Sequence, residues 1–370
     1  MRFPQLRNWF ARVLGLAWLG LAGPAQGVEA ASGPEAKPAP LQVTVPRISG
    51  RLHAVELGVV VNLNDPYSVA TAAYYQRQRQ LGEAQMLRLH LPVKPRLEPQ
   101  ELDALREQIN AHFGPDIQAL ALVWRQPFAV ACQSITAAVS LGFQSSFCAN
   151  TCGSGKNSPL FGNPSHQPWR QLGVRPSMLL AAKDEDEGRR LIDRGVAADQ
   201  TLGARFGPRS RAVFQTTGDA ARNVRSALYP PPGTMGGSGL TVERSNDDTP
   251  TLGATEGVIA YQTGLAQLRG LKQLSFLPGA LADHLTSFGG VLDGTGEQST
   301  VLEWISAGAT ASHGTVSEPC NHRQKFPHPQ VLLLNYLQGS TAIEAYWRSV
   351  LWPGQGLFVG EPLAAPFARR

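Results

Sequence analysis

Strand-like and helix-like segments alternate along this chain, and that alternation constrains the fold more than any other feature of the sequence. Residues 55–61 are mostly Val, Leu and Gly, a run typical of a buried strand. Asp65 and Pro66 follow as the N-cap and the first residue of a helix. Because a helix that connects two strands leaves them parallel, the pattern predicts a three-layer α/β fold. Its mostly parallel sheet would carry helices on both faces.

The same alternation continues to the end of the chain. Further strands are expected at residues 86–91, 117–124, 177–182, 212–216, 257–261, 309–312 and 356–359. Helices are expected at 66–78, 99–112, 184–194 (ending at Gly195), 217–228 (capped by Thr217), 295–307 (capped by Thr295 with Gln298 and closed by Gly308) and 343–351. Residues 229–250 are rich in Pro, Gly, Ser and Asp and predict a long surface loop or a hairpin.

The first 27 residues have the pattern of a secretory signal peptide. Three Arg stand among residues 1–12, an apolar run follows, and small residues at its end suit a signal peptidase. Residues 28–50 are rich in Ala, Pro, Ser and Gly and predict a disordered leader. Residues 51–370 are expected to form a single α/β domain, with two lobes as the alternative. The signal predicts a periplasmic or secreted protein.

The charge of the chain argues against a nucleic-acid partner. It carries 33 Lys and Arg against 28 Asp and Glu, a formal net charge of +5. The signal peptide holds three Arg and no acid, so its removal leaves 30 basic against 28 acidic residues, a net charge of +2. Binding to a nucleic-acid backbone needs a concentrated basic face. No apolar run beyond the signal is long enough for a membrane span. With nucleic acid disfavoured, the expected ligand is a small molecule, a peptide or a glycan.

The chain has four cysteines, Cys132, Cys148, Cys152 and Cys320. In an oxidising compartment an even number favours disulfides, and four cysteines allow three pairings that the sequence does not separate. Cys148 and Cys152 could close a short loop, and Cys132 with Cys320 would tie distant parts of the chain. A zinc site is disfavoured because no second cysteine pair stands at zinc-ligand spacing.

Candidate functional residues collect where loops leave the carboxyl ends of the expected strands, as they do in open parallel sheets. Asn62, Asn64 and Asp65 follow the first strand and could bind a ligand or cation through their oxygens. Turn formation and helix capping account for the same residues, and this interpretation is favoured. No phosphate-binding loop is expected at residues 153–156, which follow a cysteine-bearing loop and lack the leading Gly.

The polar segment 282–290 is a stronger candidate. Asp283 precedes His284, and Thr286 and Ser287 add two hydroxyls before a pair of glycines. Asp283 could hold the His284 imidazole in one tautomer, so that His284 acts as a general base or acid. Backbone amides near the glycines could stabilise an oxyanion. A polar turn whose groups satisfy one another accounts for the segment equally well.

A second polar segment, residues 312–322, contains a candidate nucleophile. A histidine can activate a cysteine thiolate, and the candidate bases for Cys320 are His284, His313 and His322. A Cys320 locked in a disulfide would lose this role. His313 and Glu318 are expected to line a binding pocket together with segment 282–290. These side chains match no standard metal-site spacing, so no metal and no cofactor are expected.

Six segments of the mature chain together resemble an uncharacterised family of exported bacterial proteins. They are residues 59–66, 132–135, 283–290, 308–320, 325–327 and 356–363. The resemblance covers nearly the whole mature chain. It implies an exported protein and assigns no activity.

A second resemblance is to the gingipain and caspase-like cysteine peptidases. A polar strand end, a capped helix closed by Gly308, a short strand, a Tyr-bearing helix and Gly-Glu-Pro-Leu at 360–363 are similar in order to the close of the gingipain catalytic domain. The resemblance implies a caspase-like topology, and a flavodoxin-like topology is the alternative. It also implies a nucleophile near 282–287 and a His-Gly pair near 261–264, where this chain has neither. Two functions are therefore predicted as alternatives: a hydrolase that uses His284, or a non-catalytic protein that binds a peptide or glycan on the same fold.

Overall fold

The computed structural model describes residues 48–203, 209–235, 238–246, 255–294 and 296–369. The expected signal peptide and residues 28–47 of the expected leader lie outside the described residues. Residues 48–50, the end of that leader, contact the folded part, since the Ile48 amide donates to Gln338 Oε1 at 2.8 Å. The described residues all belong to one compact unit.

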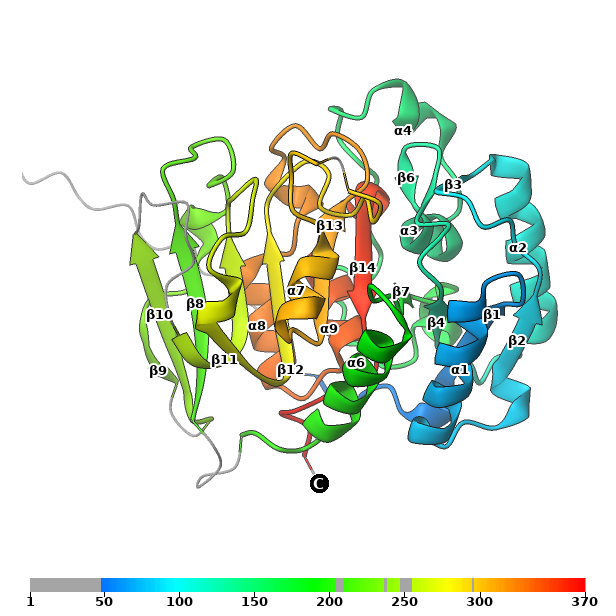
Figure 1. Ribbon diagram of the computed structural model, residues 1–370, viewed down its shortest axis with the longest axis horizontal. Helices are drawn as coiled ribbons and strands as arrows, with labels where there is room; N and C mark the ends of the chain where they lie inside the picture. Colours follow the sequence, from blue (N-terminus) through cyan, green and yellow to red (C-terminus); the bar gives the residue numbers. More distant parts are fainter. Residues whose placement is uncertain (1–47, 204–208, 236–237, 247–254, 295, 370) are drawn as a thin grey trace, which may run out of the picture. The chain divides into compact units, whose positions relative to one another are not determined.

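One mixed sheet of 11 strands runs through this unit in the order β2-β1-β4-β7-β14-β13-β12-β11-β8-β10-β9 (Figure 1). Its strands are β1 Leu57–Asn62, β2 Met86–Leu89, β4 Ala119–Val123, β7 Ser177–Leu179, β8 Ser210–Thr216, β9 Gly233–Met235, β10 Leu240–Asn246, β11 Thr255–Thr263, β12 Leu274–His284, β13 Ala311–Thr315 and β14 Gly356–Gly360. A second sheet joins β3 Arg96–Leu97, β5 Ala129–Val130 and β6 Gln133–Ser134. In the large sheet β13 pairs antiparallel with β14, and β10 with β9. Two halves of the sheet meet where Val359 of β14 lies beside Leu179 of β7.

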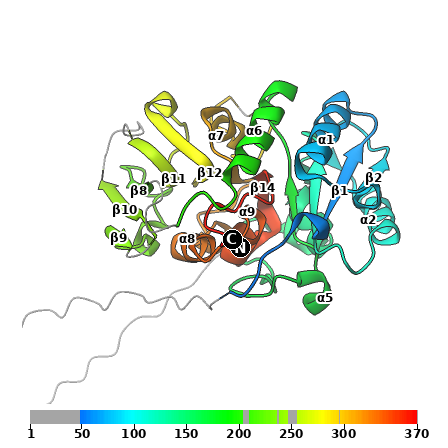
Figure 2. The same cartoon turned by 90° about the horizontal axis from the view of Figure 1, so that it is seen from below.

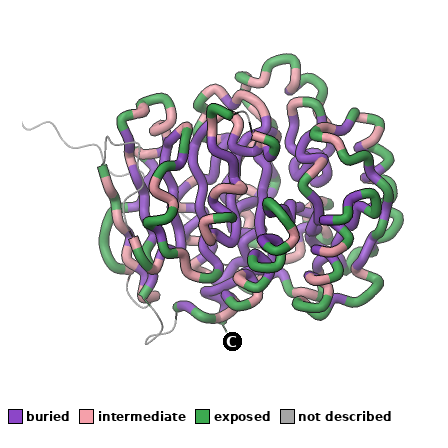
Figure 3. The backbone as a smooth tube through the Cα atoms, viewed as in Figure 1, coloured by how far each residue is buried: buried purple, intermediate pink, exposed green. Residues whose placement is uncertain are grey.

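Helices cover both faces of the large sheet, which confirms the predicted three-layer α/β fold. On one face lie α1 Pro66–Arg79, α6 Glu185–Ala198 and α7 Val301–Ala307, and on the other lie α8 Pro329–Leu337 and α9 Ala342–Ser349 (Figure 2). The remaining helices are α2 Pro99–His112, α3 Ile135–Leu141, α4 Ser145–Ala149 and α5 Pro168–Leu172. The strands between the layers are buried (Figure 3), and their aliphatic side chains form the main hydrophobic core. Within the described ranges, no helix combines the length and the apolar character that crossing a membrane requires.

Several local predictions are confirmed in detail. Asp65 caps α1, since its Oδ1 accepts a hydrogen bond from the Tyr67 amide at 3.0 Å. α2 spans the residues predicted for it, 99–112. Gly308 closes α7 at φ +114°, a left-handed conformation that suits a residue without a Cβ. The hairpin predicted as one alternative for 229–250 is present in the described part, because β9 and β10 pair antiparallel.

The helix predicted to begin at Thr217 is wrong. The Thr217 hydroxyl donates to the Gly264 carbonyl at 2.8 Å, and the Thr217 amide donates to Asn223 Oδ1 at 3.1 Å. These bonds hold a turn, and a single 3-10 turn follows at Ser226–Leu228. Side chains that satisfy the backbone locally compete with helix formation, and here they prevail.

Two predicted helix ends also need correction. α6 continues past Gly195 to Ala198. Gly195 faces Glu361, and a Cβ there would collide with the Glu361 side chain. The glycine is therefore a packing residue within the helix rather than its stop signal. The capping box of α7 is formed by Thr300 and Glu303 instead of the pair predicted from Thr295, which lies outside the described residues.

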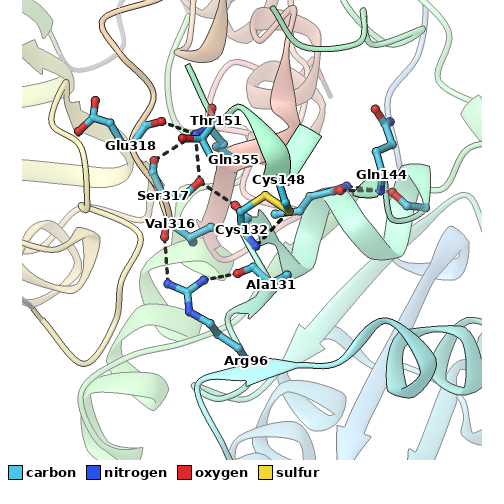
Figure 4. Close-up of a disulfide and its surroundings, with 12 residues drawn as sticks. Arg96, Ala131, Cys132, Gln144, Cys148, Thr151, Val316, Ser317, Glu318 and Gln355 are labelled. Atoms are coloured by element: carbon cyan, nitrogen blue, oxygen red, sulfur yellow. Dashed lines mark hydrogen bonds between the residues drawn. A yellow bond between two sulfur atoms is a disulfide. The ribbon is translucent and has the colours of Figure 1, made fainter. Parts of the chain in front are cut away.

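Two disulfides join Cys132 to Cys148 and Cys152 to Cys320. The predicted disulfides are confirmed, but the pairing is neither of the two singled out from the sequence. One short segment carries both Cys148 and Cys152, so it is bonded at each end. Figure 4 shows Cys132 beside the loop that follows β13, where the Ser317 hydroxyl donates to the Cys132 carbonyl at 2.7 Å. The loop after β13 is thus fastened to the first half of the chain.

Candidate functional site

The carboxyl ends of strands from both halves of the sheet lie at one edge. Gln126, after β4, donates from Nε2 to Asp293 Oδ1 at 2.7 Å in the loop after β12. The loops after β12 and β13 are joined directly, because the Gly290 amide donates to the Thr315 carbonyl at 2.9 Å. Thr315 Oγ1 also donates to the Thr286 carbonyl at 3.0 Å. The two polar segments singled out from the sequence therefore lie side by side.

His284 is completely buried. Its Nδ1 accepts a hydrogen bond from Trp304 Nε1 at 2.9 Å, and its Nε2 lies 3.0 Å from the Ser299 carbonyl. Since a carbonyl oxygen only accepts, Nε2 carries the proton and the imidazole is neutral. Burial lowers the pKa of His284 to about 4. Both nitrogens are occupied, so neither is free to take a proton from a bound substrate.

The contacts of Asp283 differ from its predicted role of holding the His284 imidazole. These residues end β12, a strand that was not predicted, and successive side chains of a strand point to opposite faces. Asp283 forms an ion pair with Arg225 at 2.6 Å and accepts a hydrogen bond from Gln262 Nε2 at 2.8 Å. Burial raises the pKa of the Asp283 carboxyl, and the Arg225 guanidinium opposes that rise. Asp283 therefore belongs to a buried ion pair on the face away from His284.

His313 lies on the same face of the sheet as Asp283. The parallel pairing of β12 with β13 puts these two residues at neighbouring positions. The His313 ring is fully buried near Phe326 and Phe358, at centroid distances of 6.0 Å and 5.2 Å. Neither ring nitrogen has a hydrogen-bond partner within the described chain. Burial lowers the pKa of His313 to about 3, so this imidazole is neutral as well.

Cys320 is bonded to Cys152, which corrects the prediction that Cys320 supplies a nucleophilic thiolate. A sulfur atom in a disulfide is no longer a thiolate. The Cys320 amide donates to Glu318 Oε1 at 2.7 Å, so the Glu318 carboxylate closes the turn before the cysteine. His322, another candidate base, lies with Nε2 2.7 Å from the Cys152 carbonyl. Over the described ranges, no group of three or more His, Cys, Asp or Glu side chains could hold a metal ion.

Asn62, Asn64 and Asp65 form bonds within their own turn and to Leu91, which follows β2. The Asn62 side-chain oxygen accepts from the amides of Asn64 at 3.1 Å and Leu91 at 2.9 Å. Asn64 Nδ2 donates to the Leu91 carbonyl at 3.0 Å, and Asp65 caps α1. These are the turn-forming and capping roles that the sequence favours for the three residues.

Thr286 belongs to a small polar network at the same edge. Its Oγ1 donates to Gln298 Oε1 at 2.7 Å, and Arg222 Nε donates to this Oγ1 at 3.3 Å. The Ser287 carbonyl accepts from Thr315 Oγ1 at 2.8 Å. Much of segment 282–290 thus consists of groups that satisfy one another.

A pocket at this edge lies between the ends of β8 and β11, and the strand order explains its place. From β8 the chain passes to β10 on one side and then to β11 on the other. Such a reversal of strand order opens a crevice at the carboxyl ends of the strands. The cavity has a volume of about 370 Å³ and is lined by Thr217, Gly218, Asp219, Leu265, Ala266, Gln267, Arg269 and Glu297.

Close contact between two loops forms the wall of this pocket. A Cβ on Gly264 would collide with the Arg222 carbonyl, so the loop after β11 approaches the loop after β8 only because residue 264 is glycine. Asp219 pairs with Arg222 at 2.6 Å. The sequence signal for this pocket is the polar Thr-Gly-Asp run at 217–219 directly after a strand, which resembles a helix start.

Comparison with family models, curated proteins and solved structures finds no match for this chain. The fold and the covalent bonds therefore define its class, a three-layer α/β protein with two disulfides.

Proposed function

We propose that this chain is an exported, non-catalytic binding protein on a scaffold related to the gingipain and caspase-like peptidases, and that it holds a peptide in the pocket between β8 and β11. One observation carries the proposal: the residues at the ends of β11 and β12 have no free reactive groups. The resemblance implies a catalytic pair at these two strand ends. β12 ends in His284, whose nitrogens are both bonded, and β11 ends in Thr263, which is buried. In the part of the chain described, no nucleophile faces a free base there.

The order of the elements supports the scaffold. α7, capped at Thr300 and closed by Gly308, is followed by β13, by the Tyr-bearing helices α8 and α9, and by β14. The last residues of β11 and β12 pair with each other, Thr263 with His284. The resemblance implies a histidine and a nucleophile at these two adjacent ends, so the fold is kept and the reactive groups are replaced.

The covalent structure supports export. Two disulfides account for all four cysteines. Such bonds persist in oxidising compartments and are rare in the cytosol. Together with the signal-like residues 1–27, they favour the periplasm or the outside of the cell.

The lining of the pocket favours a peptide over a glycan. Its volume of about 370 Å³ lies in the range of small-ligand sites. Leu265 and Ala266 contribute apolar surface, and no aromatic ring stands among the lining residues. Arg269 and Glu297 form no ion pair within the described residues, so both are available to a ligand. A peptide presents an apolar side chain together with charges of both signs, which matches this lining.

A turnover assay separates the proposal from the hydrolase alternative. The purified chain, with both disulfides intact, is incubated with unfolded polypeptides, and new amino termini are identified by mass spectrometry. We expect no cleavage, because no free base and no nucleophile face each other at the strand ends. Cleavage that is lost in His284→Gln would establish the hydrolase.

Selection from a random peptide library tests the binding site. We expect related peptides to be enriched by the wild-type chain and lost by Ala266→Trp, since an indole fills the pocket. Ala104→Trp on the exposed face of α2 is the matched control and should keep binding. The assignment to this pocket fails if no peptide is enriched or if both variants bind alike.

A further inference from the structure

A second cavity lies in the other half of the sheet and is bordered by α2, α3 and α5. Its volume is about 130 Å³, and its lining includes Arg106, Asn110, Val139, Ser140, Trp169 and Arg175. Two arginines therefore border a space that holds only a few non-hydrogen atoms. This cavity shares no residue with the pocket between β8 and β11.

Arg175 is a buried cation, with 4% of its surface exposed. Its guanidinium donates to the carbonyls of Phe113, Gly114 and Ile117, each at 2.9 Å. Nη1 also donates to Asn110 Oδ1 at 3.3 Å, and the guanidinium carbon lies 3.6 Å from the centroid of the Trp169 ring. Because a guanidinium has five N–H donors, one N–H of Nη1 is left without a partner in the described chain.

Among the described residues, no carboxylate forms an ion pair with Arg175. Asp116 precedes Ile117, whose carbonyl accepts from Arg175, but the Asp116 carboxylate is paired with Arg170. Burial lowers the pKa of Arg175 to about 10, and no acidic side chain opposes that shift. The positive charge is thus balanced only by carbonyl dipoles and the face of Trp169.

Arg106 extends from α2 to the same cavity. Its Nε donates to the Val139 carbonyl at 3.2 Å, and its Nη1 and Nη2 have no hydrogen-bond or ion-pair partner in the described residues. Arg106 is half-buried, and the acids closest to it on α2, Asp103 and Glu107, are exposed and form no ion pair with it. Two cations therefore border one small cavity without an anion.

A buried charge without a counter-charge is unfavourable. An oxyanion in the cavity would supply that counter-charge and accept the free N–H groups, because charge-assisted bonds to guanidinium are short and strong. We propose that this cavity binds a small oxyanion of phosphate size, held by Arg106 and by the free N–H of Arg175. At about 30 Å³ for each water-sized group, the cavity accommodates about four such groups, which suits phosphate or sulfate.

Titration calorimetry with inorganic phosphate at constant ionic strength tests this site. We expect saturable binding to one site, and Arg106→Gln should weaken the phosphate affinity at least about tenfold, because it removes charge-assisted bonds. Arg190→Gln removes the same charge from an exposed position on α6 and is the matched control. Its affinity should stay within about twofold of the wild-type value, since exposed distant charges are screened.

A second measurement locates the anion. The Trp169 indole N–H signal is assigned as the one that is absent from the NMR spectrum of Trp169→Phe. When phosphate is added to the wild-type chain, this signal should shift more than those of the other tryptophans. Sulfate should compete with phosphate. The proposal is overturned if phosphate gives no saturable heat, if Arg106→Gln binds as tightly as the wild type, or if the Trp169 signal does not move. Tighter binding of acetate than of phosphate would overturn the assigned ligand class.

Discussion

The two edges of the large sheet are held together in different ways. At the edge where β13 begins, the buried Glu361 carboxylate accepts hydrogen bonds from Tyr75 Oη at 2.6 Å and from Arg79 Nε at 3.0 Å and Nη2 at 2.7 Å. Asp199 pairs with the same guanidinium at 2.5 Å. At the opposite edge, the Cys152–Cys320 disulfide fastens the loop after β13 to the first half of the chain, and the Cys132–Cys148 disulfide lies beside it.

The two edges also differ in whether the buried polar side-chain atoms near them have hydrogen-bond partners. Around Glu361, the Tyr75 hydroxyl and each of the three guanidinium nitrogens of Arg79 have an acceptor. Below the disulfide-bonded edge, Arg225 Nε, Gln262 Oε1 and both nitrogens of His313 have no partner in the described chain. An unsatisfied buried polar group is unfavourable by about 1–3 kcal/mol. The disulfides thus lie at the edge where buried polar atoms are incompletely matched, while ion pairs and hydrogen bonds hold the edge where they are matched.

Glu361→Gln should give the largest loss of stability, because it removes the charge beside the buried Arg79 guanidinium and replaces one of its three acceptor oxygens by an NH2 group. We expect the free energy of unfolding in urea to fall by about 3–5 kcal/mol. Glu83→Gln is the control, since Glu83 forms an exposed ion pair with Arg88 whose loss should leave the free energy of unfolding nearly unchanged. Similar losses in both variants would contradict the role assigned to the Glu361 cluster.

Removing one disulfide tests the covalent side of the comparison. Cys152→Ser with Cys320→Ser should lower the free energy of unfolding by about 2–4 kcal/mol. The double Cys132→Ser, Cys148→Ser variant should lose less, because its bond closes a sequence separation of 16 residues against 168. The order of the two losses, measured by urea unfolding, checks the account. The reverse order would show that local contacts outweigh loop closure at this edge.

Stability should fall in weak acid because the buried histidines resist protonation. The pKa of His284 is about 4 and that of His313 about 3, below the value of about 6.5 for an unfolded chain. Above pH 7 both states are neutral and these residues contribute no pH dependence. Between about pH 6.5 and 4 the unfolded chain binds more protons, so stability falls by up to about 1.4 kcal/mol per pH unit for each histidine. Urea unfolding at pH 7, 6 and 5 measures the slope, which should be shallower in His313→Leu.

The smallest effect is expected for His313→Leu at pH 7. It replaces a ring with two unpartnered nitrogens by an apolar side chain, so stability should change by less than about 1 kcal/mol or rise. His284→Leu is the matched comparison and should lose about 1–3 kcal/mol, because it leaves the Trp304 N–H and the Ser299 carbonyl without partners. Equal losses in the two variants would show that His313 has partners that the contacts do not reveal.

Local signals predicted much of the fold. α2 agrees with its prediction at both ends because Pro99 stands at its first position and Glu101 bonds back to the Glu98 amide. β12 was not predicted, since Pro278 and Gly279 interrupt its pattern and its first half is partly exposed. At the candidate site, the sequence singled out two polar segments that do meet. It did not reveal that His284 is sealed or that Cys320 is oxidised with Cys152.

The sequence by itself determined the alternation of strands and helices, the cap at Asp65 and the pairing of the cysteines in some combination. These depend on residues a few positions apart or on composition. Only the tertiary structure decided which cysteines pair, which face each buried histidine occupies, and where two arginines meet at a cavity. Each of these depends on contacts between residues far apart in the chain. Strand order and side-chain direction determine those contacts, and both are defined only in the complete sheet.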